Sequence, residues 1–306
     1  MALTYDQISA ITQRKIIPKL VDNIFDSNPL LQRAKSKFYE SVDGGIEIQQ
    51  PLNYALSAAG DWYTGSETLD TTDTDVMTSA NFAWKTIYEP ITIRRLDELK
   101  NSGDSAKLKF VAQKTQIAEK SLMDKMGTAM WNAGSASNAI AGLRYILSTS
   151  NSPGGISQST YSWWAAQVNS SSTVLTLSVL NTLDQLCTIG NDGPSVGLTT
   201  RTLYNSLYGL FTPQQRFQDN ETAKGGFSSL MINGKAVIVD SHCPANHFAF
   251  LNEKYLHLYY HPDENFRFEP FAKPVNQNVK VAKIFWAGAL GSSNNRMHGL
   301  ASALTS

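Results

Sequence analysis

Hydrophobic residues recur at helical spacing over residues 104–132, the longest continuous helical pattern in the chain. Lysines and acids occupy the other faces, and the apolar positions are Val111, Ala118, Leu122, Met126, Ala129 and Met130. Asp104 can cap the first turn by accepting a backbone N–H, and Gly134 suits a left-handed cap after the last turn. At 1.5 Å per residue the pattern predicts a rod of roughly 43 Å that lies across a sheet or spans a flat domain.

Two patterns precede this helix. Residues 6–25 are amphipathic and predict one helix, or two short ones broken near Pro18. Their isoleucine-rich face includes Ile16 and Ile17 and is large for a small element, so it needs a partner surface. From Phe38 the period changes to two and predicts long strands around residues 46–49 and 82–89.

The connection between these strands, residues 51–80, contains no Lys or Arg and little periodicity. Linkers of about 30 residues without secondary structure are rare inside compact domains and usually form functional or partner-bound extensions. Trp62 and Tyr63 would be unfavourable in free solution. We therefore predict a projecting arm that lies on another surface, and a basic one, because its charged residues are all acids: Asp61, Glu67, Asp70, Asp73 and Asp75.

The second half of the chain has shorter elements. Residues 134–173 are rich in Gly, Ser and Asn and predict irregular structure. Helices are expected at 177–189 and 203–211, and strands near 198–200, 248–251, 255–260, 266–268 and 279–286. Asn233-Gly234 predicts a tight hairpin, because a type I′ turn needs positive φ at both central residues. The sequence predicts an α+β fold without internal repeats.

Composition excludes several classes of function. The 306 residues are 42% hydrophobic, and 26 Lys and Arg balance 26 Asp and Glu. A neutral chain has no general attraction to nucleic acid, so a sequence-specific DNA reader is not expected. No apolar run is long enough to span a bilayer, and we expect no membrane association. Cys187 and Cys243 are expected to be small buried hydrophobes without a disulfide, as in a reducing cytosol.

Three segments carry residues of chemical interest. Residues 193–197 read Gly-Pro-Ser-Val-Gly, the pattern of a serine hydrolase with Ser195 as nucleophile, but a helix precedes this segment and a strand follows it, the reverse of the required order. His242, Cys243 and His247 are zinc-type ligands, yet a closed site needs four, so we interpret them as a turn between strands around Pro244. The aspartates of the acidic arm lack the Gly and Glu of a calcium loop. No metal, cofactor or catalytic site is predicted.

The order of these elements resembles the major capsid proteins of tailed bacteriophages with the HK97-type fold. The resemblance covers essentially the whole chain and rests on the long helix together with three segments: EPITIRRLDE at 89–98, GFSSLMINGKAVIVD at 226–240 and FLNEKYLHLYY at 250–260. It implies an N-terminal arm at 1–37, an extended loop at 38–97, a peripheral domain at 98–169 and 262–286 with the long helix as its spine, and an axial domain at 170–261 and 287–306.

The resemblance also implies function and partners. It implies a shell protein, not an enzyme, that assembles as hexamers and pentamers around double-stranded DNA without sequence-specific contacts. A portal protein and a separate scaffolding protein are implied, because the chain begins almost directly with the arm, and a decoration protein is compatible. The expected locations are the virion capsid and, during assembly, the host cytoplasm. Expected subunit contacts are Ile16, Ile17, Asp61, Trp62, Tyr63, Glu67, Asp70, Asp73, Asp75, Lys107, Lys114 and Lys120.

Two alternatives remain open from the sequence. An encapsulin, a cellular compartment shell that encloses cargo enzymes, would share the fold. A serine hydrolase using Ser195 belongs to a different class. Some relatives of the capsid family crosslink subunits through a lysine and an asparagine, but no lysine lies between residues 51 and 84, so this chemistry is not expected here.

Overall fold

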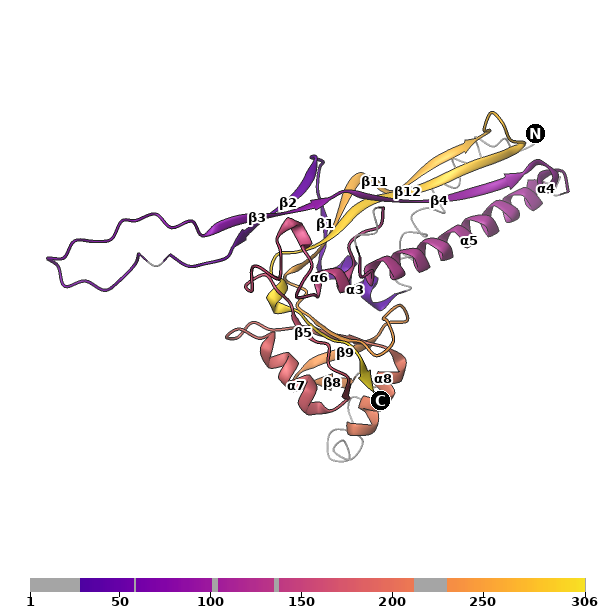
Figure 1. Cartoon of the computed structure of the whole chain (residues 1–306). Coiled ribbons are helices and arrows are strands. Elements are labelled where there is room, and N and C mark those ends of the chain that lie inside the picture. The colour runs from indigo at the N-terminus through magenta and orange to yellow at the C-terminus, as the bar shows by residue number, and fades with distance from the viewer. Residues whose placement is uncertain (1–27, 58, 101–103, 135–137, 212–229, 306) are drawn as a thin grey trace.

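A computed structural model describes residues 28–57, 59–100, 104–134, 138–211 and 230–305. Figure 1 shows an elongated sheet with a long helix beside it, a second body below, and a loop that projects far to the left. The mixture of helices and sheets confirms the predicted α+β class. Among the described residues, no helix is both long and apolar enough to cross a bilayer.

The elongated sheet has four strands in the order β1-β11-β12-β4. They are β1 (Tyr39–Ser41), β11 (Leu256–Ala272), β12 (Val279–Ser292) and β4 (Lys85–Arg94). Two separate strands were predicted where β11 runs as one. The prediction was wrong because β11 stays paired with β12 through register shifts between Tyr260 and Asn265 and between Glu269 and Ala272, where Pro262 and Pro270 interrupt the alternation.

The strand predicted at 82–89 also differs in the structure. It divides at Trp84 into β3 (Met77–Ala83), which pairs with β2 (Glu47–Asn53), and β4, which pairs with β12. The buried positions change parity across Trp84: Phe82 is buried in β3, whereas Ile91 and Ile93 are buried in β4. Pro90 is tolerated because β4 is an edge strand.

The long helix α5 (Asp104–Met130) packs against β4 and confirms the predicted rod. Five of its six predicted inward residues are buried, and Ala129 is partly buried. The helix closes with tight bonds from the Trp131 N–H to the Thr128 carbonyl at 3.2 Å and from Asn132 to Ala129 at 3.1 Å. Gly134 lies too far beyond this end to cap it, and its N–H bonds the Asn132 side chain instead.

The second body contains a six-stranded sheet in the order β5-β13-β10-β7-β9-β8. Asn233 and Gly234 both have positive φ, 51° and 77°, which confirms the predicted tight turn. The helices α7 (Leu177–Leu186) and α8 (Arg201–Phe211) add apolar residues to its core. The strands are β5 (Gln167–Asn169), β13 (Gly299–Ala301), β10 (Phe248–Leu251), β7 (Val196–Thr199), β9 (Lys235–Val239) and β8 (Leu230–Ile232).

Short elements complete the fold. The helix α3 (Pro29–Lys37), which the hydrophobic pattern did not predict, is capped by the Asn28 side chain and starts with a proline. The helices α4 (Arg95–Lys100) and α6 (Leu143–Ile146) flank α5 in sequence. The remaining short pieces are β6 (Thr173–Val174), β14 (Leu304–Thr305), and the single turns Pro153–Gly155 and Asn295–Met297.

Both cysteines are buried with free thiols, as predicted. Cys187 lies in the core of the second body, and Cys243 lies in the larger core below the elongated sheet. Burial raises the pKa of the Cys187 thiol to about 12 and also raises that of Cys243. Both therefore remain protonated and unreactive at neutral pH.

His298 is fully buried beside β13 and makes the stability of the subunit depend on pH. Its Nδ1 accepts the Asn252 N–H at 3.1 Å, and Nε2 lies 3.2 Å from Ser292 Oγ. Burial, with a contribution from His257, lowers the pKa of His298 from 6.5 to about 3. Between these values only the unfolded chain binds the proton, so the stabilisation is complete above pH 6.5 and falls as pH drops toward 3.

We expect this group to reduce the free energy of unfolding by up to about 1.4 kcal/mol per pH unit across that window. Urea unfolding of the unassembled subunit at pH 7, 6 and 5 would measure the slope. His298→Gln should give a shallower slope, since other titrating groups are common to both proteins. Equal slopes would contradict the assignment.

Candidate functional site

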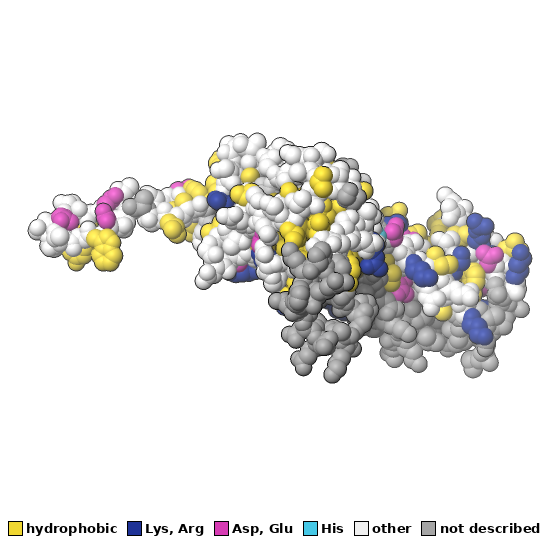
Figure 2. Space-filling view, turned by 90° about the horizontal axis from the view of Figure 1, so that it is seen from below, with side chains coloured by type: hydrophobic (Ala, Val, Ile, Leu, Met, Phe, Trp, Pro, Cys, Tyr) yellow, Lys and Arg dark blue, Asp and Glu magenta, His cyan; other side chains and the backbone are white. Residues whose placement is uncertain are grey.

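The projecting loop, residues 54–76, extends beyond the two-stranded sheet of β2 and β3 (Figure 1). Trp62 is 97% exposed and Tyr63 64% exposed, and Leu56 and Leu69 are exposed as well. Figure 2 shows hydrophobic and acidic side chains on this loop and no basic ones. Large apolar side chains held this far from any core indicate a surface that another molecule covers.

The acids of the projecting loop are held by local hydrogen bonds. Asp61 Oδ1 accepts the Trp62 N–H at 2.7 Å, and the Thr64 hydroxyl donates to Glu67 at 2.5 Å. Hydrogen bonds from the Thr72 hydroxyl and N–H lower the pKa of Asp70. The acids Asp61, Glu67, Asp70, Asp73 and Asp75 form no ion pair with any described residue, so their charge is available to a partner.

The predicted basic partners lie elsewhere. Lys120 on α5 is exposed, and Lys107 and Lys114 are partly exposed, with Lys114 Nζ 5.6 Å from the centre of the Phe110 ring. The projecting loop points away from α5 in Figure 1, so the structure does not bring these two charge sets together within one chain. Ile16 and Ile17, the predicted contacts of the N-terminal arm, lie outside the described residues.

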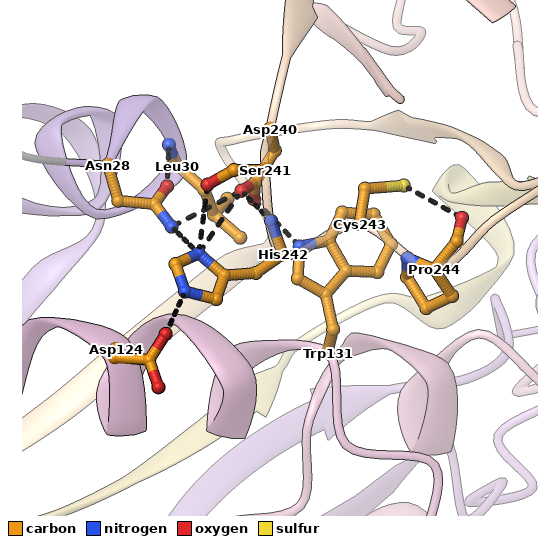
Figure 3. Close-up of polar contacts among 9 residues, drawn as sticks. All are labelled: Asn28, Leu30, Asp124, Trp131, Asp240, Ser241, His242, Cys243 and Pro244. Carbon is orange, nitrogen blue, oxygen red and sulfur yellow. Dashed lines mark hydrogen bonds and ion pairs between the residues drawn. The ribbon is translucent and has the colours of Figure 1, made fainter. Parts of the chain in front are cut away.

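A buried polar junction joins α3, α5 and the turn after β9 (Figure 3). Its centre is Asp240, which accepts hydrogen bonds from Trp131 Nε1 at 2.7 Å, the His242 N–H at 2.9 Å and Asn28 Nδ2 at 3.2 Å. A buried carboxylate is tolerated only when donors surround it. This junction ties the end of α5 to the second body, and no periodic pattern in the sequence predicts it.

The zinc-type residues belong to this junction and its neighbourhood. His242 Nδ1 lies 3.0 Å from Asn28 Nδ2, and its Nε2 lies 3.2 Å from Asp124 Oδ1. His247 Nδ1 lies 2.7 Å from the Ala245 carbonyl, and Cys243 is buried. In the described part of the chain, no three His, Cys, Asp or Glu side chains are arranged to hold a metal ion. The segment forms the turn between β9 and β10, as interpreted from the sequence.

Ser195 has a structural partner in Glu253. Its hydroxyl donates to Glu253 Oε2 at 2.7 Å, and Arg33 binds the same carboxylate through Nε at 2.5 Å and Nη2 at 2.8 Å. Burial favours the neutral acid, but the bonds from Arg33 and Ser195 outweigh it and lower the pKa of Glu253. Ser195 lies between α7 and β7, the order of elements that the sequence predicted, and its contacts fasten α3 to the second body.

No known protein-family model matches the sequence, and none of the curated proteins matches it. The structure, however, is similar to solved shell proteins. The capsid asymmetric unit of cyanophage A-1(L) is 16% identical, with a TM-score of 0.64 over 91% of this chain and 93% of that chain. The capsid of a native GTA particle is 10% identical, with a TM-score of 0.64 over 89% and 90%.

The holo-SrpI encapsulin complex from Synechococcus elongatus is also similar, at 11% identity and a TM-score of 0.54 over 88% of this chain and 86% of that chain. At these identities the likeness concerns the fold and covers nearly the whole length of each chain. The chain therefore has the HK97-type fold of phage capsid subunits, as its sequence predicted.

Proposed function

We propose that this chain is the major capsid protein of a tailed bacteriophage. Copies assemble as hexamers and pentamers into an icosahedral shell around double-stranded DNA. On this proposal we expect the protein in the virion capsid and, during assembly, in the host cytoplasm. The proposal is supported by the HK97-type fold and by similarity to the capsid subunits of several phages.

The observation that carries the proposal is the projecting loop. Trp62, within the projecting loop, is 97% exposed and joins none of the hydrophobic cores of the described residues. Repeated copies of one subunit can bury such a surface on each other, and closed symmetric assemblies make every copy of the contact equivalent. The loop is thus the part of the molecule that best fits assembly.

Roles for the other parts follow from this proposal. Residues 98–169 and 262–286 form the peripheral domain with α5 as its spine, and residues 170–261 and 287–306 form the axial domain that gathers subunits around a symmetry axis. We assign residues 1–37 to the N-terminal arm, of which the structure describes residues 28–37. The chain carries no net charge, which suits a shell that encloses DNA without sequence-specific binding. A scaffolding protein, a portal protein and, on the outer face, a decoration protein are its proposed partners.

An encapsulin-like compartment shell is the second candidate, because the structure also resembles an encapsulin and a virus-like particle from Pyrococcus furiosus. The contents of purified particles distinguish the two. DNA inside particles produced during phage growth supports the capsid proposal, whereas a co-purifying enzyme supports a compartment. Labelling of Ser195 by a fluorophosphonate would instead indicate a serine hydrolase. We expect no labelling, because the Ser195 hydroxyl donates a hydrogen bond to Glu253.

The charges of the projecting loop and α5 lead to a prediction about salt. We expect high salt to slow shell formation, and Lys114→Glu with Lys120→Glu to weaken it, because an acidic loop from one subunit would then meet acids on the next. Each exposed ion pair contributes only about 0 to 1 kcal/mol. The double variant should therefore raise the subunit concentration needed for assembly about two- to tenfold.

Light scattering during assembly, at low salt and at several salt concentrations, would measure the effect. Arg201→Glu, a charge reversal at an exposed position on α8, is the matched control and should change assembly less. An assembly rate that depends neither on salt nor on the two lysines would leave the apolar residues of the loop to carry the contact alone.

A further inference from the structure

A pocket of about 940 Å³ lies where the end of α5 meets the start of β4. Its walls include Ile87, Met126, Ala129, Trp131, Ile140 and Trp286. The indole N–H groups of the two tryptophans already bind Asp240 and the Tyr39 hydroxyl, at 2.7 and 3.1 Å. The pocket thus offers mainly the apolar surface of rings and aliphatic side chains. Its volume is similar to that of sites that bury a small ligand.

The rim of this pocket is basic. Lys85, Lys125 and Arg144 line it, against one acid, Asp124, which lies within hydrogen-bonding distance of His242. Lys125 bridges to Glu89 at 2.5 Å, whereas Arg144 forms no ion pair with any described residue. An apolar floor with a cationic rim fits an occupant that presents a large apolar side chain next to carboxylates.

The tip of the projecting loop has this chemistry. Trp62 is 97% exposed, and the carboxylate of Asp61 directly before it accepts the Trp62 N–H but forms no ion pair with any described residue. The loop points away from α5 in its own chain, so the same molecule does not supply this occupant. We propose that the pocket between α5 and β4 receives the Trp62 side chain of a second copy of this chain, with Asp61 placed beside the basic rim. This inference rests on the proposed shell function and names its receiving site.

Two substitutions of the full-length chain test the contact from both sides. Trp62→Ala removes the occupant, and Ala129→Trp fills the pocket. We expect each to raise the subunit concentration needed for shell formation at least about tenfold, as for buried aromatic hot spots. The double variant should lose little more than either single one, because both remove the same contact. Val275→Ala and Ala272→Trp, at exposed positions near the end of β11, are the control substitutions. Each should change the subunit concentration needed for shell formation by less than about twofold.

A photo-crosslinking experiment identifies the surface that residue 62 contacts on another subunit. A benzoylphenylalanine replaces Trp62 in subunits of one isotopic composition, and particles are assembled with unsubstituted subunits of another. The expected crosslinks join the two compositions and map to Met126, Ala129, Ile140 or their neighbours in the pocket. Closed shells whose crosslinks map to another surface would overturn this inference and leave the proposed function intact.

The reverse probe places benzoylphenylalanine at Ala129. Capture of residues 55–75 from another copy supports the inference, whereas capture of residues 1–27 would overturn it and show that the N-terminal arm occupies the pocket. If the unsubstituted chain formed no shells under any assembly condition, the proposed function itself would fail. The outcomes for the site and for the function are thus distinct.

Discussion

Replacing residues 55–75 by a short Gly-Ser linker should give a folded, soluble subunit that forms no closed shells. The projecting loop contributes no residue to the buried cores of the described structure, so its removal should leave the free energy of unfolding almost unchanged. In an assembly the same deletion removes Trp62, Tyr63 and all five acids from every subunit contact. Aromatic anchors at interfaces often contribute 2 kcal/mol or more each, so repeated loss should abolish assembly.

Sedimentation velocity would measure assembly, and urea unfolding would measure the stability of the subunit. A variant with its five loop acids changed to amides separates the two contributions, because it keeps Trp62 and Tyr63 while removing the charge. We expect this variant to assemble more weakly than the unsubstituted chain but better than the deletion. Normal shells from the deletion variant would show that the projecting loop is not required for assembly.

The second large effect is expected at Asp240. Asp240→Ala should destabilise the subunit by about 3–5 kcal/mol, because it leaves Trp131 Nε1 buried without its acceptor, removes one of the two partners of Asn28 Nδ2, and opens a void between α5 and the second body. Asp240→Asn keeps one acceptor oxygen and should cost less, about 1–2 kcal/mol.

Urea unfolding of the unassembled subunit, followed by tryptophan fluorescence, would measure these differences. Asp75→Ala, an aspartate substitution in the exposed projecting loop, is the matched control and should change stability by less than about 0.5 kcal/mol. Equal effects at Asp240 and Asp75 would show that the junction of Figure 3 does not hold α5 to the second body.

Local sequence signals predicted the elements whose conformation is locally determined. The 3.6-residue period defined α5, and Asn233-Gly234 defined its hairpin because few other residues adopt positive φ there. The projecting loop was recognisable from what it lacks, namely periodicity and basic residues. These features predicted the α+β class, and their order along the chain carried the resemblance that implied the HK97-type fold.

Long-range contacts were not predictable in the same way. Two strands were predicted in place of β11 because the alternation of hydrophobic and polar residues fails at Pro262. The strand continues because β11 pairs with β12 both before and after the register shift between Tyr260 and Asn265. The contacts of Asp240 join residues up to 212 positions apart, so no spacing rule reveals them. The same holds for the pocket beside α5, whose walls come from β4, α5, α6 and β12.

The central claim, that this chain forms a shell, is tested most directly by electron microscopy of the purified full-length protein. The sample should be imaged alone and after co-production with the scaffolding protein of the same phage. The account predicts closed particles of uniform size built from hexamers and pentamers. A population that stays monomeric, or forms only irregular aggregates under both conditions, would contradict it.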